Sequence, residues 1–176
     1  MKRLFQKFLS SVHKNKRGKG IVICGWVSSG STFVYQIVRS LGFDPVSIHG
    51  TPDFYSPKAF FTFRDPRDII LSWAKRHFAS TYENDPQKAI GLAIDFVIEE
   101  GYDQDYVKAS NSPNIMFIRY EDYFGGREAN LVKLIADQLS CPVSESEANK
   151  IHQDNSLDRN KERASTVLRG ERTPFS

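Results

Sequence analysis

A chain of 176 residues is long enough for one compact domain, and 40% hydrophobic with 26% charged residues is an ordinary globular composition. A formal net charge of +3 suits an anionic ligand but lies far below the charge density of a nucleic-acid-binding protein. No apolar run approaches the roughly 20 residues needed to cross a bilayer. Cys24 and Cys141 lack metal-ligand spacing, and two cysteines are too few for a dense disulfide framework, so we expect a soluble protein of the reducing cytoplasm.

The first 19 residues form a basic segment that we expect to stand apart from a single domain over 20–176. Basic residues interrupt its apolar positions, so it does not match a signal peptide. Two interpretations remain: a helix that lies on an anionic membrane surface, or a helix packed on the domain and followed by a basic linker. We favour the second. The apolar positions recur at helical spacing: Leu4, Phe5, Phe8, Leu9 and Val12.

The remaining residues predict strands that alternate with helices. Short apolar runs at 21–24, 59–63 and 115–118 are typical of buried strands, and 46–48 is a shorter extended piece. This alternation predicts an α/β fold, a single domain whose parallel sheet is covered by helices on both faces, with ligands at the carboxyl ends of the strands. Helices are expected over 33–41, from Pro66 onward, from 89 to about 100, over 131–139, and after a capping box of Ser144 with Glu147.

The turn after the first strand, residues 25–32, reads G-W-V-S-S-G-S-T. It matches the phosphate-loop pattern G-x-x-x-x-G-K-S/T at every specified position except Ser31, where a lysine is expected. Backbone N–H groups and the helix dipole can bind phosphate there without the lysine, and the hydroxyls of Ser29, Ser31 and Thr32 add donors. The missing lysine argues against ATP or GTP hydrolysis and against a small kinase. An ordinary turn without a ligand is the alternative.

A second group of residues begins where the strand at 59–63 ends. Asp65 and Pro66 are explained as the N-cap and first position of a helix. The helix start does not explain Arg64. An arginine there can bind a phosphate through its forked guanidinium group. Ser72 lies about two turns into the helix, so it meets Arg64 only if the corner between strand and helix brings the two together.

Together these segments resemble the sulfotransferase family, over about residues 21–139. That family carries a basic residue followed by S-G-S/T-T after its first strand, then R-D/N-P-R-D-x-x-x-S, and a Tyr-Glu-Asp segment. Ser29 to Thr32, Arg64 to Ser72, and Arg119-Tyr120-Glu121-Asp122 match these in order. The resemblance implies a P-loop-like fold and 3′-phosphoadenosine 5′-phosphosulfate (PAPS) as sulfuryl donor, without a metal. It implies cofactor contacts from Ser29, Gly30, Ser31, Thr32, Phe33, Arg64, Ser72 and Tyr120.

The sequence departs from the family pattern at three places. Ser28 takes the catalytic position where the family has the basic residue that stabilises the leaving oxygen. The family's basic-glycine segment, which closes over the 3′-phosphate, is matched only weakly here, by Arg169 and Gly170. Little chain remains after that segment to cover an acceptor, so we expect the helix at 86–100 and the N-terminus to supply the acceptor surface.

His49 follows the short strand at 46–48, and the resemblance implies that it takes the place of the family's catalytic histidine, with Asp53 in reserve. A purely structural histidine is the alternative. Trp26 and Phe33 flank the turn, and we expect either one to stack on adenine or to line the acceptor pocket; the alternative is that both are core residues. The sequence therefore predicts sulfuryl transfer from PAPS to a hydroxyl or amine on a small-molecule, carbohydrate or peptide acceptor. The alternative is a catalytically weakened relative that keeps the phosphate sites.

Overall fold

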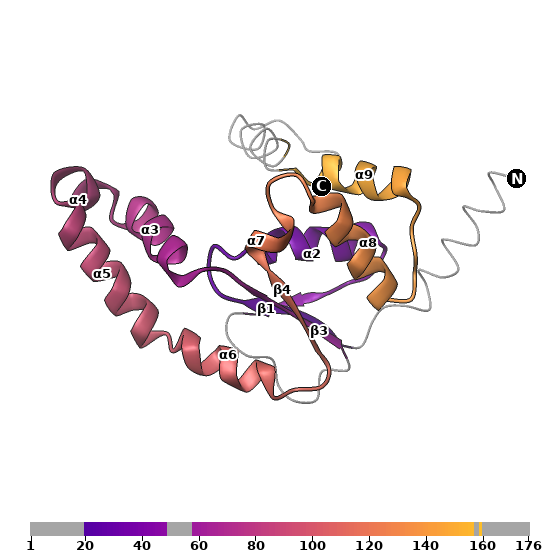
Figure 1. Ribbon diagram of the computed structural model, residues 1–176, viewed down its shortest axis with the longest axis horizontal. Helices are drawn as coiled ribbons and strands as arrows, with labels where there is room; N and C mark the ends of the chain where they lie inside the picture. Colours follow the sequence, from indigo (N-terminus) through magenta and orange to yellow (C-terminus); the bar gives the residue numbers. More distant parts are fainter. Residues whose placement is uncertain (1–19, 49–57, 157–158, 160–176) are drawn as a thin grey trace, which may run out of the picture.

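The computed structural model describes residues 20–48, 58–156 and 159. Its centre is a parallel sheet of four strands in the order β2-β1-β3-β4, seen edge-on in Figure 1. The strands are β1 (Ile21–Gly25), β2 (Val46–Ser47), β3 (Lys58–Phe63) and β4 (Ile115–Arg119). These match the extended segments predicted from the sequence to within about a residue at each end.

The register of the sheet brings the carboxyl ends of its three longer strands to one edge. Gly25 at the end of β1 pairs with Thr62, and Arg119 at the end of β4 pairs with Phe63. A functional site is expected at this edge because side chains that follow parallel strands meet there.

Helices cover both faces of the sheet, as the alternating pattern predicted. One face carries α2 (Ser31–Ser40), α8 (Glu128–Gln138) and α9 (Glu145–Asp154), which begins with the predicted capping box. Against the other face lies α6 (Tyr102–Ser110), on the opposite side of the strands in Figure 1. Side chains of the strands alternate between the two layers: Ile21, Ile23, Phe60 and Ile118 join the α2 side, and Cys24, Phe61 and Phe117 join the α6 side.

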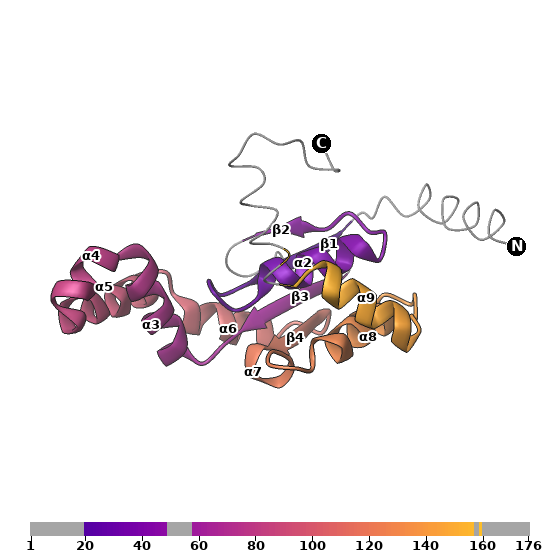
Figure 2. The same ribbon diagram turned by 90° about the horizontal axis from the view of Figure 1, so that it is seen from above.

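Three further helices form an arm that projects beyond the end of the sheet (Figures 1 and 2). They are α3 (Pro66–His77), α4 (Ala79–Asn84) and α5 (Pro86–Glu99). Both α3 and α5 begin with an aspartate that caps the first turn and a proline directly after it. Their contact is built on buried alanines, which allow close approach of the helices: Ala74, Ala89 and Ala93.

Two helices have no counterpart in the sequence prediction. The first, α6, buries only Tyr102 and Ala109, so it lacks the apolar stripe by which a helix is recognised. The second, α7 (Tyr120–Tyr123), is a single turn. In the described part of the chain no helix is long and apolar enough to span a membrane. The basic segment at 1–19 lies outside the described residues, so its separation from the domain stays a prediction.

The close approach of β1 and β3 at Gly25 gives a test of the fold. This glycine has φ +140°, and a Cβ atom there would lie 2.1 Å from the carbonyl oxygen of Thr62. Gly25→Ala should therefore lower the free energy of unfolding by roughly 3 kcal/mol or more, measured by urea denaturation. Gly91→Ala is the matched control, because a Cβ atom there meets nothing within 4 Å. That helical substitution should add about 0.5–1 kcal/mol. Equal effects at the two positions would contradict the packing described.

Candidate functional site

The turn between β1 and α2 is built for close backbone packing. The backbone N–H of Trp26 donates to the carbonyl oxygen of Thr62 at 3.0 Å, which extends the contact between β1 and β3 past the strand end. Ser28 has φ 56° and Gly30 has φ 92°, so the chain reverses through two left-handed residues before α2 begins. Gly30 occupies the N-cap position and offers no side-chain cap. The positive end of the α2 dipole is thus presented at the carboxyl edge of the sheet.

Ser29 holds this turn together. Its side chain is fully buried. The Ser29 hydroxyl donates to the carbonyl oxygen of Trp26 and lies 2.6 Å from the hydroxyl of Thr62. The hydroxyl that the sequence predicted as a phosphate donor is therefore directed into the protein. Ser31 is half-buried and Thr32 exposed, so their side chains remain accessible at the helix start.

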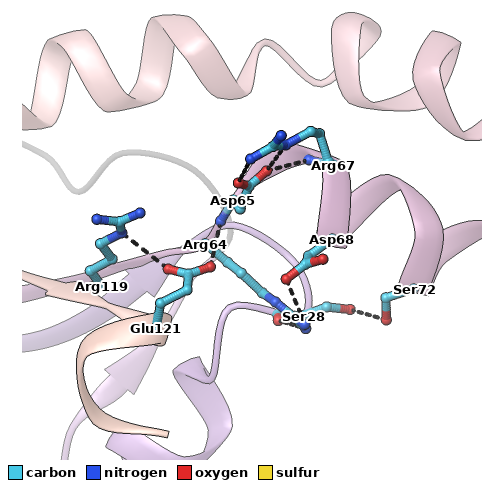
Figure 3. A network of polar contacts seen from close by, with 8 residues as sticks. All are labelled: Ser28, Arg64, Asp65, Arg67, Asp68, Ser72, Arg119 and Glu121. Atoms are coloured by element: carbon cyan, nitrogen blue, oxygen red, sulfur yellow. Dashed lines mark hydrogen bonds and ion pairs between the residues drawn. The ribbon is translucent and has the colours of Figure 1, made fainter.

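Arg64, Ser72 and Ser28 converge beside this turn (Figure 3). The Arg64 guanidinium donates to the backbone oxygen of Ser28 at 3.5 Å and to the Asp68 carboxylate at 3.2 Å. The hydroxyl of Ser72 donates to the hydroxyl of Ser28 at 3.4 Å. The corner between β3 and α3 thus brings Arg64 and Ser72 to the same place, as their spacing required. The corner depends on Asp65, whose side chain accepts from the backbone N–H of Arg67.

The Arg64 side chain is arranged as an anion-binding group. Its guanidinium lies over the ring of Tyr120, 4.3 Å from the ring centre. Its Nε atom is buried and has no hydrogen-bond partner among the described residues. A buried donor without an acceptor is costly, and an anionic oxygen beside it would satisfy it. The residues present therefore fit the phosphate group that the sequence implied here.

The aromatic side chains near the turn separate onto the two faces of the sheet. On the α2 side, Tyr120 stacks on Phe124 at 4.0 Å between ring centres, and Phe33 meets Phe124 at 5.5 Å. A Cβ atom on Gly30 would lie 2.6 Å from the Phe124 ring, so only glycine fits between turn and ring. Trp26 lies on the α6 side instead. Phe33 and Trp26, which the sequence treated alike, thus flank different regions.

Glu121 links the ends of β3 and β4, and the sequence assigned it no role of its own. Its carboxylate accepts from the backbone N–H of Asp65 at 2.8 Å and from the Arg119 side chain at 3.2 Å (Figure 3). Burial raises its pKa, but these hydrogen bonds and one from its own backbone outweigh burial and leave the pKa below its ordinary value. Its position just past β4, next to Tyr120, is the sequence signal that could have identified it.

A hollow of about 410 Å³ opens at the carboxyl ends of β3 and β4, beside Trp26. Aromatic side chains form much of its wall, and charged side chains from the strand ends form the rest. Its volume falls in the range of small-molecule binding sites. The lining residues are Trp26, Phe63, Arg64, Asp65, Pro66, Tyr106 and Arg119.

Four residues singled out from the sequence, His49, Asp53, Arg169 and Gly170, lie outside the described residues. The last described residue before His49 is Ile48, which packs in the same apolar cluster as Trp26. The described residues contain no group of three His, Cys, Asp or Glu side chains that could hold a metal ion.

Comparison with known proteins shows the family. The model of the sulfotransferase domain matches residues 50–171, well over half of the chain, and includes Arg64, Ser72 and Tyr120. The chain therefore belongs to the sulfotransferase domain family and is a sulfotransferase. A search of curated protein sequences found no match.

Among solved structures, the crystal structure of mouse sulfotransferase SULT7A1 complexed with PAP is similar, with a TM-score of 0.62 and 15% identity. The match covers 87% of this chain and 70% of that one. At this identity the likeness concerns the fold, and it confirms the predicted single-domain architecture with a parallel sheet between helices.

The Glu121 link gives a pH prediction. A carboxylate whose pKa is lowered on folding adds stability above its unfolded pKa of about 4.3, and that stability is lost as pH falls through the folded value. Glu121→Gln should therefore be less stable than wild type at pH 6, with the two converging near pH 3. Urea midpoints across this range measure the difference. Asp122→Asn, which removes the exposed neighbouring carboxylate, is the matched control.

Proposed function

We propose that the protein transfers a sulfuryl group from PAPS to a hydroxyl or amine acceptor. The observation that carries the proposal is the convergence of Arg64, Ser72 and Ser28 beside the N-terminus of α2. Membership of the sulfotransferase family supports the reaction, and the structurally similar mouse enzyme was crystallised with PAP. When bound, PAPS supplies a sulfuryl group activated by its linkage to a phosphate.

The proposed nucleotide contacts follow from the two phosphate-binding features of the site. Arg64 and Ser72 bind the 3′-phosphate, with the unpartnered Nε of Arg64 as one donor. Backbone N–H groups of Gly30, Ser31 and Thr32, at the positive end of α2, bind the 5′-phosphate. Tyr120 and Phe33 lie on this side of the sheet, so we assign them to the adenosine rather than to the acceptor.

The surroundings of Ser28 matter because the family's basic residue is missing at this position. The Arg64 guanidinium lies against the backbone oxygen of Ser28, so positive charge is present there despite the serine. The Ser28 hydroxyl faces Ser72, which associates Ser28 with phosphate binding more closely than with catalysis.

Activation of the acceptor is assigned to His49, with Asp53 in reserve. An acceptor hydroxyl must lose its proton as its oxygen bonds to sulfur, and an imidazole with a pKa near neutrality suits this role. The chain enters this segment from Ile48, whose backbone N–H donates to Ile23 at 2.9 Å and whose side chain joins the Trp26 cluster. The segment thus begins on the face of the sheet that carries the hollow. Arg169 and Gly170 remain proposed contacts to the 3′-phosphate.

The alternative function is a nucleotide-binding relative with weak or no transfer activity, and the serine at position 28 is the observation that favours it. Incubation with radiolabelled PAPS and a panel of alcohols, phenols, sugars and tyrosine peptides separates the two. Labelled product from any acceptor supports the enzyme. Tight binding of 3′-phosphoadenosine 5′-phosphate (PAP) without product from the whole panel supports the alternative.

Recognition of the 3′-phosphate is tested by Arg64→Ala. Wild type should bind PAP more tightly than AMP in calorimetry. The variant should bind PAP about 30-fold more weakly, a loss of about 2 kcal/mol, because a charge-assisted contact is removed. Arg67→Ala, whose side chain is 88% exposed, is the matched control and should change PAP affinity little. Equal affinity of wild type for PAP and AMP would remove the main support for the proposal.

The role of His49 is tested by His49→Ala. Turnover should fall about 10²–10⁴-fold, the usual contribution of general-base catalysis, while PAP affinity stays near that of wild type. Initial rates with a hydroxyl acceptor and PAP calorimetry on the same preparation provide both values. Weakened PAP binding would place His49 at the nucleotide instead, and unchanged turnover would move the base role to Asp53.

A further inference from the structure

A second hollow, of about 210 Å³, lies between the arm and the sheet. Its wall is almost entirely apolar, and Asp103 is the one charged side chain among the described residues that line it. Two of its residues, Val97 and Ile98, come from α5, the helix expected from the sequence to supply acceptor surface. The lining comprises Trp26, Pro66, Ile69, Val97, Ile98, Tyr102 and Asp103.

The two hollows meet at Trp26 and Pro66, which line both. The Trp26 indole N–H donates to the backbone oxygen of Tyr102 at 2.9 Å, and its ring contacts Tyr102 and Tyr106 at about 6 Å between centres. The only polar group of the indole is therefore satisfied by the protein. What Trp26 offers to a ligand is an apolar surface.

The lining changes from partly charged in the larger hollow to almost entirely apolar in the smaller one. The larger hollow is lined by Arg64, Asp65 and Arg119 at the strand ends, and Arg64 also contacts Ser28 in the phosphate site. The smaller hollow leads away from those charges toward α5. Ile98 at its wall is 69% exposed, a large apolar side chain left open to solvent. A ligand that fills both hollows has a polar end near the phosphate site and an apolar end against the arm.

We propose that the acceptor is a small molecule with a hydroxyl at one end of an extended apolar body, such as a fatty alcohol, rather than a sugar or a peptide. The inference rests on the proposed sulfuryl transfer. Each hydroxyl of a sugar, or each amide of a peptide, would need a hydrogen-bond partner, and the smaller hollow offers almost none. An alkyl chain needs none, and it gains free energy from covering Trp26, Val97 and Ile98.

The homologous series from 1-butanol to 1-decanol tests this without turnover. The chain has two tryptophans, so Trp73→Phe leaves Trp26 as the sole tryptophan reporter. Each added methylene should tighten binding about fourfold, read from Trp26 emission, until the hollows are full. Methyl glucoside should leave the emission unchanged. Affinity independent of chain length, or a response to methyl glucoside instead, overturns the proposal.

A matched pair of variants on α5 locates the binding. Ile98→Glu puts a charge on the wall of the smaller hollow, and the exposed position leaves folding intact. It should weaken 1-decanol binding at least about tenfold. Leu92→Glu, at another exposed apolar position of α5 that lines neither hollow, should bind 1-decanol like the parent protein. Equal effects of both variants would place the alcohol elsewhere and overturn the proposal.

Two further measurements separate the failure modes. If PAP binds in calorimetry but the alcohols show no dependence on length, the acceptor class is wrong and the proposed function stands. If the alcohols bind as expected but PAP does not, the proposed function fails and the apolar site remains. Sedimentation tests whether a second copy of the chain occupies this face instead. If the wild type is a dimer that Ile98→Glu dissociates, and alcohol binding does not depend on chain length, this face is an interface between copies and the proposal is overturned.

Discussion

The site depends on the hydrogen bonds by which Thr62 of β3 holds the turn that follows β1. Its carbonyl oxygen accepts from the backbone of Trp26, and its hydroxyl meets Ser29 at 2.6 Å. The absence of a side chain at Gly25 makes this approach possible. Because the turn is held to β3, Ser28 is placed against Arg64, which directly follows β3. The start of α2 and the guanidinium thus have a fixed relation before any ligand binds, which reduces the cost of ordering on binding.

Much of this arrangement could be predicted from the sequence because local rules determine it. The strands at 21–24, 59–63 and 115–118 are short, apolar and bounded by turn residues, and the structure confirms them. The meeting of Arg64 with Ser72 required only that Asp65 and Pro66 start a helix at the strand end. Each of these features depends on a few neighbouring residues.

Features that depend on contacts between distant residues could not be predicted in the same way. A serine in a phosphate loop can donate to a ligand or to the protein, and only the position of Thr62 decides that Ser29 does the latter. The division of Trp26 and Phe33 between the two faces depends on α6, which has too few buried residues to be recognised. The bridge from Glu121 to Asp65 joins residues 56 positions apart.

The arm of α3, α4 and α5 ties the two proposed binding regions to one body. Ser72 lies on α3 beside Ser28, and Ile98 lies on α5 beside the smaller hollow. The alanine contacts and the stack of Trp73 on Phe96, at 4.2 Å, hold the two helices together. A small rotation of the arm about the corner at Pro66 would therefore displace both walls at once. The affinities for donor and acceptor would then be linked, because a ligand that favours one orientation of the arm would change the affinity for the other, equally in both directions.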